Sequence, residues 1–131
     1  MADMTTREEV RTEAAPAPVG PYSQGIRSGN LVFASGQIPL DPATGEKVEG
    51  EIEDEARQVL ANLKAVLEAG GSSMDRVVKA TVYLTDLSLF PRVNAVYAEA
   101  FSADPAPARV TVGVSALPLG AQAEIDAIAL A

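Results

Sequence analysis

The 131-residue chain lacks the two residue types that most often carry acid–base and nucleophilic chemistry. It contains no histidine, which is the commonest general base and metal ligand, and no cysteine, which supplies thiolate nucleophiles and disulfides. Any catalysis must therefore use Glu, Asp, Arg, Lys, Tyr, Ser, Thr or backbone groups. This restriction narrows the search to a few positions.

Arg109 is the most informative of these positions, because it is the only basic residue after Arg92. It opens the segment 109–116, which otherwise consists mainly of small and β-branched residues. The alternation of a strand places Arg109 and Thr111 on one face and the valines of the segment on the other. A guanidinium matches a carboxylate through two parallel hydrogen bonds, so Arg109 is a candidate anion clamp. The position of Arg109 in the sequence is equally compatible with a solvent-exposed arginine at the edge of a sheet that binds nothing.

The last segment, 121–130, alternates in the same way and carries two acids. Glu124 and Asp126 share one face with Gln122, while alanines and Ile125 occupy the other. A strand face that carries two carboxylates is usually the solvent-exposed side of a sheet. If this strand neighbours 109–116, however, a carboxylate lies within a substrate's length of Arg109, and the pair can hold an anion and activate a water. The register is not determined at this level, so the choice between the two acids stays open.

Three further polar residues are weaker candidates. Tyr22 follows a Gly-Pro pair in a turn, where a tyrosine more often packs than functions. Ser35 precedes Gly36 and could place a hydroxyl and backbone amides near a ligand, although Ser-Gly is common at strand ends. Asn94 falls on the polar side of a predicted helix and could equally cap a neighbouring loop. No dinucleotide-binding, Walker or EF-hand spacing occurs, so neither a nucleotide cofactor nor a metal is expected.

The patterning around these residues predicts the elements that position them. Prolines between 16 and 21 favour extended backbone, and residues 22–27 and 31–38 are expected to form a hairpin. Residues 41–55 form an acidic loop. Apolar residues at steps of three and four predict a helix from about 56 to 70 and a second helix after an N-cap at Ser88. Segments 77–84, 109–116 and 121–130 are expected to be strands.

The resulting order, ββαβαββ, is typical of an α+β sandwich with both helices on one face of a mixed sheet. Aliphatic residues on the uncovered face would favour the association of identical chains. Residues 1–14 show no periodicity and are expected to form a flexible tail. Residues 15–131 are expected to form a single domain.

Charge and hydropathy exclude several classes of partner. Ten basic and eighteen acidic residues give a net charge of −8, which repels nucleic-acid backbones and anionic lipid. No apolar run reaches the roughly 18 residues that a spanning helix needs, and the first residues lack the pattern of a secretory signal. We therefore expect a cytoplasmic protein with no nucleic acid and no membrane among its partners.

Several spaced motifs give the chain a resemblance to a known family. They are APVGPYSQG (17–25), LVFASGQIPLDPATGE (31–46), QVLANLKAVLEAGG (58–71), VVKATVYLTD (77–86), VNAVYAEAF (93–101), PARVTV (107–112) and AEIDAIA (123–129). Together they resemble the RidA/YjgF family of reactive-intermediate deaminases, from about residue 15 to the end of the sequence. The resemblance implies a chorismate-mutase-like fold, a homotrimer with active sites in clefts between subunits, and no cofactor.

The resemblance also implies an activity, the hydrolysis of enamine and imine intermediates such as 2-aminoacrylate, 2-iminopropanoate and 2-iminobutanoate. The products are 2-keto acids and ammonia. The expected small-molecule partners are therefore 2-imino acids and 2-keto acids. In this assignment Arg109 clamps the substrate carboxylate and Glu124 positions and activates the attacking water. Tyr22 lines the pocket, and Ser35 and Asn94 shape it or its subunit boundary. Thr111 stands where many members have cysteine, which implies a shift in substrate preference.

The implied reaction agrees with the residue inventory. An imine carbon is already electrophilic, so a held carboxylate and an oriented water matter more than a strong nucleophile. Two other functions remain as alternatives. One is a non-catalytic trimer that binds a keto acid or amino acid through the same arginine. The other is ribonuclease or translation-inhibitor activity, which is attributed to some relatives; the net charge of −8 and the lack of histidine argue against it.

Overall fold

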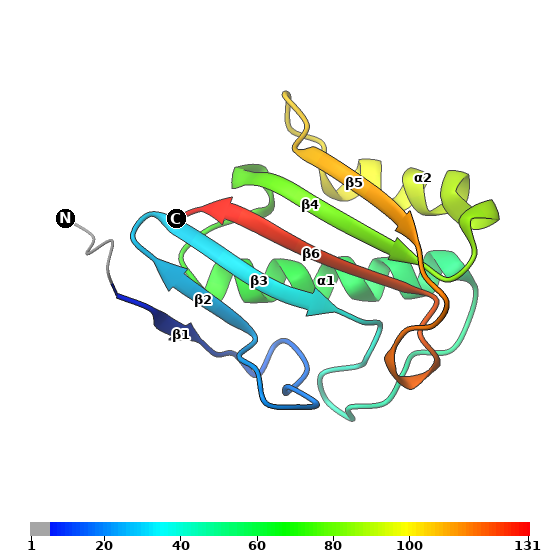
Figure 1. Cartoon of the computed structure of the whole chain (residues 1–131), viewed down its shortest axis with the longest axis horizontal. Helices are drawn as coiled ribbons and strands as arrows, with labels where there is room; N and C mark the ends of the chain where they lie inside the picture. Colours follow the sequence, from blue (N-terminus) through cyan, green and yellow to red (C-terminus); the bar gives the residue numbers. More distant parts are fainter. Residues whose placement is uncertain (1–5) are drawn as a thin grey trace.

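Six strands pair into one sheet in the computed structural model, which describes residues 6–131. Their order is β1-β2-β3-β6-β4-β5, and only β4 and β5 run parallel. The helices α1 and α2 lie on one face of this sheet (Figure 1). The prediction of an α+β sandwich with a mixed sheet is confirmed. The bounds are β1 (Glu8–Val10), β2 (Gly25–Ser28), β3 (Leu31–Gln37), α1 (Ile52–Ala69), β4 (Val77–Leu84), α2 (Phe90–Ala100), β5 (Ala108–Gly113) and β6 (Ala123–Leu130).

The helix α1 forms where apolar residues recur at helical spacing and acids fill the first turn. Asp54 accepts a hydrogen bond of 2.9 Å from the backbone N–H of Glu51, which caps the N-terminus. The helix therefore begins at Ile52, inside the stretch expected to be an acidic loop over 41–55. Its buried face lies against the sheet and is formed by Ile52, Ala56, Val59, Leu60, Leu63, Val66 and Leu67.

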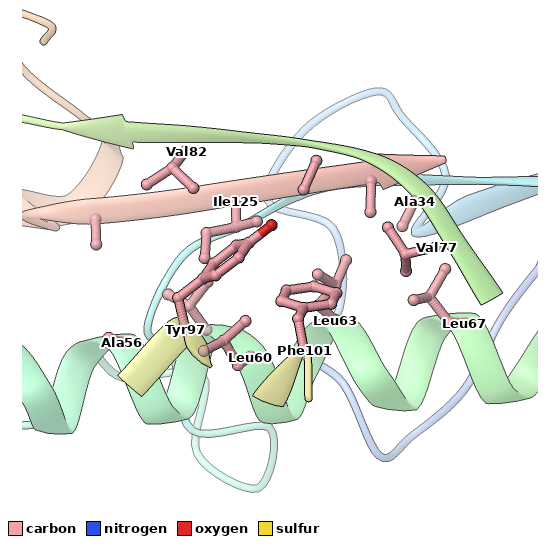
Figure 2. Packing of buried hydrophobic residues seen from close by; sticks show 14 of the residues in the cluster. Ala34, Ala56, Leu60, Leu63, Leu67, Val77, Val82, Tyr97, Phe101 and Ile125 are labelled. Carbon is pink, nitrogen blue, oxygen red and sulfur yellow. The ribbon is translucent and has the colours of Figure 1, made fainter. Parts of the chain in front are cut away.

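The core lies between the helices and the sheet. Alternate residues of β6, namely Ala123, Ile125, Ala127 and Ala129, are buried, as the period of a strand predicts. Tyr97 and Phe101 reach from α2 into the same cluster, with ring centroids 4.5 Å apart (Figure 2). The other buried apolar residues in the described part of the chain are aliphatic, so Tyr97 and Phe101 are its two buried aromatic residues.

The opposite face of the sheet is left without a covering layer. Large apolar side chains are exposed there: Phe33 is 40% exposed, Val110 44% and Leu130 38%. Phe33 and Leu130 each stand beside a buried neighbour, Val32 and Ala129 respectively, as the alternation of a strand requires. A sheet face of this kind, with exposed apolar side chains on several strands, is typical of a protein–protein contact surface.

The N-terminal segment departs from its prediction as a flexible tail over 1–14. Glu8–Val10 form β1, which pairs antiparallel with β2 and places Val10 in the core at 4% exposure. The buried amide of Gln24 then binds the backbone at Thr12, accepting from its N–H at 2.7 Å and donating to its carbonyl at 2.9 Å. The packed domain thus begins earlier than residue 15. The part of the predicted tail at 1–5 lies outside the described residues.

The start of the second helix also differs from the expected N-cap at Ser88. Asp86 caps the turn that precedes the helix, because its carboxylate accepts from the backbone N–H of Ser88 at 2.9 Å, and the N-cap of α2 itself is Leu89, without a side-chain hydrogen bond. A short 3₁₀ turn over Leu87–Leu89 follows, and α2 begins at Phe90 with Pro91 in its first turn. Both residues are good caps, and the extended backbone at Asp86 decides between them.

Candidate active site

Glu124 lies at the wall of a cleft of about 330 Å³ on the uncovered side of the sheet. The side chain is partly buried. Burial, followed by the nearby charge of Asp126, raises the pKa of the Glu124 carboxyl above its ordinary value. A raised pKa makes the carboxylate a stronger base, which suits a general base. The cleft is lined by Val19, Tyr22, Ser35, Gly36, Ile38, Pro118 and Glu124.

Gly36 makes room for the Glu124 carboxylate. A Cβ built at Gly36 would overlap a carboxylate oxygen of Glu124, so only glycine allows this close approach. The ladder between β3 and β6 shifts its register between Ala34 and Gln37. A bulge of this kind re-aims side chains at the place where the regular pairing ends. It places the Ser35–Gly36 backbone beside Glu124.

The two other predicted residues in this cleft have structural partners. The Ser35 hydroxyl donates to the Ser23 carbonyl at 2.5 Å. The Tyr22 hydroxyl accepts from the Val19 N–H at 3.1 Å, while the ring remains 46% exposed. Tyr22 and Ser35 thus hold the turn that forms one wall of the cleft, and the exposed face of the tyrosine ring remains available to a ligand.

The structure resolves which of the two acids in β6 faces the cleft. Asp126 accepts a hydrogen bond from the Tyr83 hydroxyl at 2.8 Å, and this bond raises the pKa of Tyr83. Glu124, which pairs with Tyr83 across the ladder, instead enters the cleft. Asp126 therefore acts on Glu124 through its charge, while Glu124 is the acid available to a substrate.

Arg109 is positioned by residues of α2 rather than by β6. Its guanidinium donates to the Asn94 side-chain oxygen at 2.7 Å and lies 4.8 Å from the centre of the Tyr97 ring and 5.2 Å from that of Phe90. The aromatic faces attract the cation while the residue as a whole stays exposed. The guanidinium is thus oriented and still open to an anion.

Thr111, the other residue predicted on this strand face, contributes a buried hydroxyl. Its Oγ1 atom and the hydroxyl oxygen of Tyr97 have no hydrogen-bond partner in the described part of the chain. Burial raises the pKa of Tyr97, so this hydroxyl keeps its proton. Both hydroxyl oxygens are buried, so Tyr97 meets Arg109 through its ring and Thr111 shares only its strand face with the arginine.

The two parts of the predicted site lie on opposite faces of the sheet. Arg109 packs on the helix side, against α2, whereas Glu124 points to the uncovered side. The strand β4 lies between β5 and β6, so segments 109–116 and 121–130 are not neighbours and the condition for pairing Arg109 with an acid of the same chain is not met. One chain therefore carries two half-sites: an arginine half-site (Arg109, Asn94, Thr111) and a carboxylate half-site (Glu124, Tyr22, Ser35, Gly36).

The described surface also has two grooves larger than the Glu124 cleft. No group of three or more acidic side chains that could hold a metal ion occurs within 6–131. No helix in that same range is long and apolar enough to cross a membrane. A groove of about 420 Å³ lies between α1 and α2, and one of about 710 Å³ lies beyond Tyr22, next to the N-terminal segment.

The fold is a small α+β domain that presents an exposed, oriented arginine on one face of its sheet and a separate cleft with a carboxylate on the other. The sequence profile described as Endoribonuclease L-PSP matches residues 12–131. A protein of Arabidopsis thaliana named Reactive Intermediate Deaminase A, chloroplastic, is 49% identical over 128 residues, which are 98% of this chain and 68% of that protein. The chain belongs to this family, the RidA/YjgF family.

Individual relatives cover almost the whole sequence. A RutC family protein of Pyrococcus horikoshii is 55% identical over 123 residues, which are 94% of this chain and 97% of that protein. A protein of Dermatophagoides farinae named 2-iminobutanoate/2-iminopropanoate deaminase is 46% identical over 125 residues, covering 95% and 97% of the two chains. The crystal structure of the YjgF gene product of E. coli superposes with a TM-score of 0.88 at 46% identity, covering 94% and 98%.

Proposed function

We propose that this protein hydrolyses 2-imino acids, and their enamine tautomers such as 2-aminoacrylate, to 2-keto acids and ammonia. The observation that carries the proposal is the pair of complementary half-sites: an oriented, exposed guanidinium and a partly buried carboxylate with a raised pKa. The names of two relatives, a reactive intermediate deaminase and a 2-iminobutanoate/2-iminopropanoate deaminase, support the same reaction class.

In the proposed reaction Arg109 binds the substrate carboxylate through two charge-assisted hydrogen bonds. Glu124 accepts a proton from a water molecule as the water oxygen forms a bond to the imine carbon. The imine reacts in its nitrogen-protonated form, so the electron pair of the C=N double bond moves to nitrogen and leaves a neutral NH2 group on the tetrahedral carbinolamine. Glu124 then gives the proton it took from water to this nitrogen, which makes it a leaving group. The carbonyl forms as the C–N bond breaks, and the hydroxyl proton leaves with ammonia as ammonium, so no cofactor is required.

The proposed site needs two copies of the chain. The arginine half-site and the carboxylate half-site lie on opposite faces of one sheet, so a neighbouring copy must bring the second half. The uncovered face, with Phe33, Val110 and Leu130 exposed, is the surface we assign to this contact. A cyclic homotrimer with three equivalent shared sites satisfies both requirements.

The test is an assay that generates 2-iminopropanoate or 2-iminobutanoate in situ and follows its loss. We expect wild type to accelerate hydrolysis, and Arg109→Ala and Glu124→Gln to abolish the acceleration. Arg57→Ala is the matched control, because this exposed arginine makes only a 3.8 Å pair with Asp54 on the surface of α1. Binding of the keto acid without turnover by wild type would contradict the proposal and favour a regulatory ligand-binding protein.

The description of the family as endoribonucleases is tested with the same preparations. With a net charge of −8, the chain repels the phosphate backbone, so we expect no RNA cleavage by nuclease-free protein. Cleavage that is lost in both Arg109→Ala and Glu124→Gln would assign the ribonuclease reaction to this site instead.

A further inference from the structure

Four polar side chains are buried in the described part of the structure: Gln24, Gln37, Glu55 and Asn62. Asn62 donates to the carbonyls of Ile38 and Leu40, and Gln37 donates to that of Ser35. Ile38 and Ser35 line the Glu124 cleft. Buried polar groups are costly unless they are bound, so Asn62 and Gln37 fix the backbone at the wall of this cleft.

Glu55 is the one acid among these four and is fully buried, at 0% exposure. Its two oxygens accept from the backbone N–H of Gln122 at 2.9 Å and from the Gln122 side-chain amide at 2.7 Å. Lys47 approaches one of these oxygens at 3.4 Å. The short contacts go to Gln122, and the lysine, 31% exposed, is the most distant donor. Hydrogen bonds to Gln122 are therefore the main interactions of this carboxylate.

Gln122 is held on its other side as well, because its carbonyl accepts from the backbone N–H of Thr85 at 3.1 Å. The chain then enters β6 at Ala123 and reaches Glu124, two residues beyond Gln122. The Glu124 carboxylate fits against Gly36 with no space for a Cβ. A shift at the start of β6 would move this carboxylate out of its place against Gly36.

We propose that Glu55 is a positioning residue that holds Glu124 in the cleft through its hydrogen bonds to Gln122. This inference rests on the proposed function only for its kinetic consequence. Arg109 belongs to the other half-site and is not touched by Glu55. Loss of the bridge should therefore lower kcat, which depends on the activated water, and leave KM, which depends on carboxylate binding, nearly unchanged.

The experiment compares Glu55→Met with Glu55→Gln. Methionine keeps the volume but cannot accept the two bonds, and we expect kcat to fall about 10- to 100-fold with KM within about twofold. Glutamine still accepts from the Gln122 N–H, and a flip of the Gln122 amide restores the second bond. We therefore expect Glu55→Gln to retain at least about half of the wild-type kcat.

Two further variants separate positioning from stability. Leu67→Ala removes a buried side chain at the far end of α1, and at a comparable fall in Tm it should leave kcat unchanged. If Glu55→Met does not fold, Gln122→Met, which loses one of the two bonds, should show a smaller fall in kcat with the same constant KM. Unchanged kcat in the folded methionine variants, or an equal loss in Leu67→Ala, would overturn the inference.

A readout without turnover separates this inference from the proposed function. The pKa of the Glu124 carboxyl, followed by NMR titration, is raised by its burial in the cleft. We expect this pKa to fall toward the ordinary value in Glu55→Met and to stay raised in Glu55→Gln. An inactive wild type with this NMR response would refute the deaminase and retain Glu55 as a positioning residue. The same pKa in all three proteins would refute the positioning role.

Discussion

Two inactive variants should restore each other's activity when their chains assemble together. Arg109→Ala keeps the carboxylate half-site intact, and Glu124→Gln keeps the arginine half-site intact. Because the two half-sites lie on opposite faces of the sheet, a site shared between neighbouring copies can combine the good half of each variant. Co-expression with two different affinity tags, followed by tandem purification, would yield the mixed assemblies.

The activity expected of the mixed assemblies is large compared with the residual activity of either variant alone. Loss of two charge-assisted hydrogen bonds to the substrate, each worth about 1.5–3 kcal/mol, corresponds to a fall in kcat/KM of at least about 100-fold for Arg109→Ala. Removal of a general base costs about 10²- to 10⁴-fold for Glu124→Gln. In a cyclic trimer that contains both variants, whichever of them is present twice, one of the three shared sites joins an intact arginine to an intact glutamate. The activity from these intact sites is far above the residual activity of assemblies made of either variant alone.

The control replaces Glu124→Gln with the double variant Arg109→Ala/Glu124→Gln. Mixed assemblies of this double variant with Arg109→Ala contain no intact arginine and should remain at background. Recovery to roughly one third of wild type in the first mixture, without recovery in the second, confirms a shared site. If both mixtures stay at background although mass spectrometry shows mixed assemblies, the assignment of the two half-sites to different copies is refuted.

Three further predictions follow from the geometry. Because the base must be ionised, kcat/KM should fall as the pH drops through the raised pKa of Glu124. Asp126→Asn removes the neighbouring negative charge, so this fall in the pH profile of kcat/KM should move to lower pH. A profile that does not move would exclude the charge of Asp126 as a cause of the raised pKa of Glu124. Gly36→Ala should lower kcat more than about tenfold, because its Cβ displaces the Glu124 carboxylate, and an active variant would refute this packing argument. Asn94→Ala should raise KM about 5- to 10-fold with kcat maintained, because Arg109 loses its 2.7 Å partner; isothermal titration with a keto acid checks the same loss.

Much of the local structure follows from the residue pattern. The alternation in β6 predicts which residues are buried, and the structure confirms it for Ala123, Ile125 and Ala127. The helical spacing of the residues from Ala56 to Leu67 likewise predicts the buried stripe of α1. These predictions succeed because period alone decides which face of an element is apolar. The same reasoning misses β1, whose three residues are too few to show a period.

The role of each acid depends on partners that are distant in sequence. In the sequence Glu55 is one of three acids near the start of a helix, a pattern that is explained by the helix dipole. In the structure Glu55 is buried, because Gln122, 67 residues later, brings two donors to it. The choice between Glu124 and Asp126 is made in the same way, by the hydroxyl of Tyr83. Buried charge is stable only where such partners converge, and convergence is a property of the tertiary structure.

The sequence by itself determined the α+β class, the buried faces and the inventory of Arg109, Glu124 and their polar neighbours as the groups available for chemistry. Only the tertiary structure decided how these groups are arranged. The unit β4-α2-β5 runs parallel and carries β5 to the edge of the sheet, and the last strand, β6, enters between β3 and β4. Alternation within a strand says nothing of strand order. It therefore could not show that the arginine and the glutamate point to opposite faces, and that the site is divided.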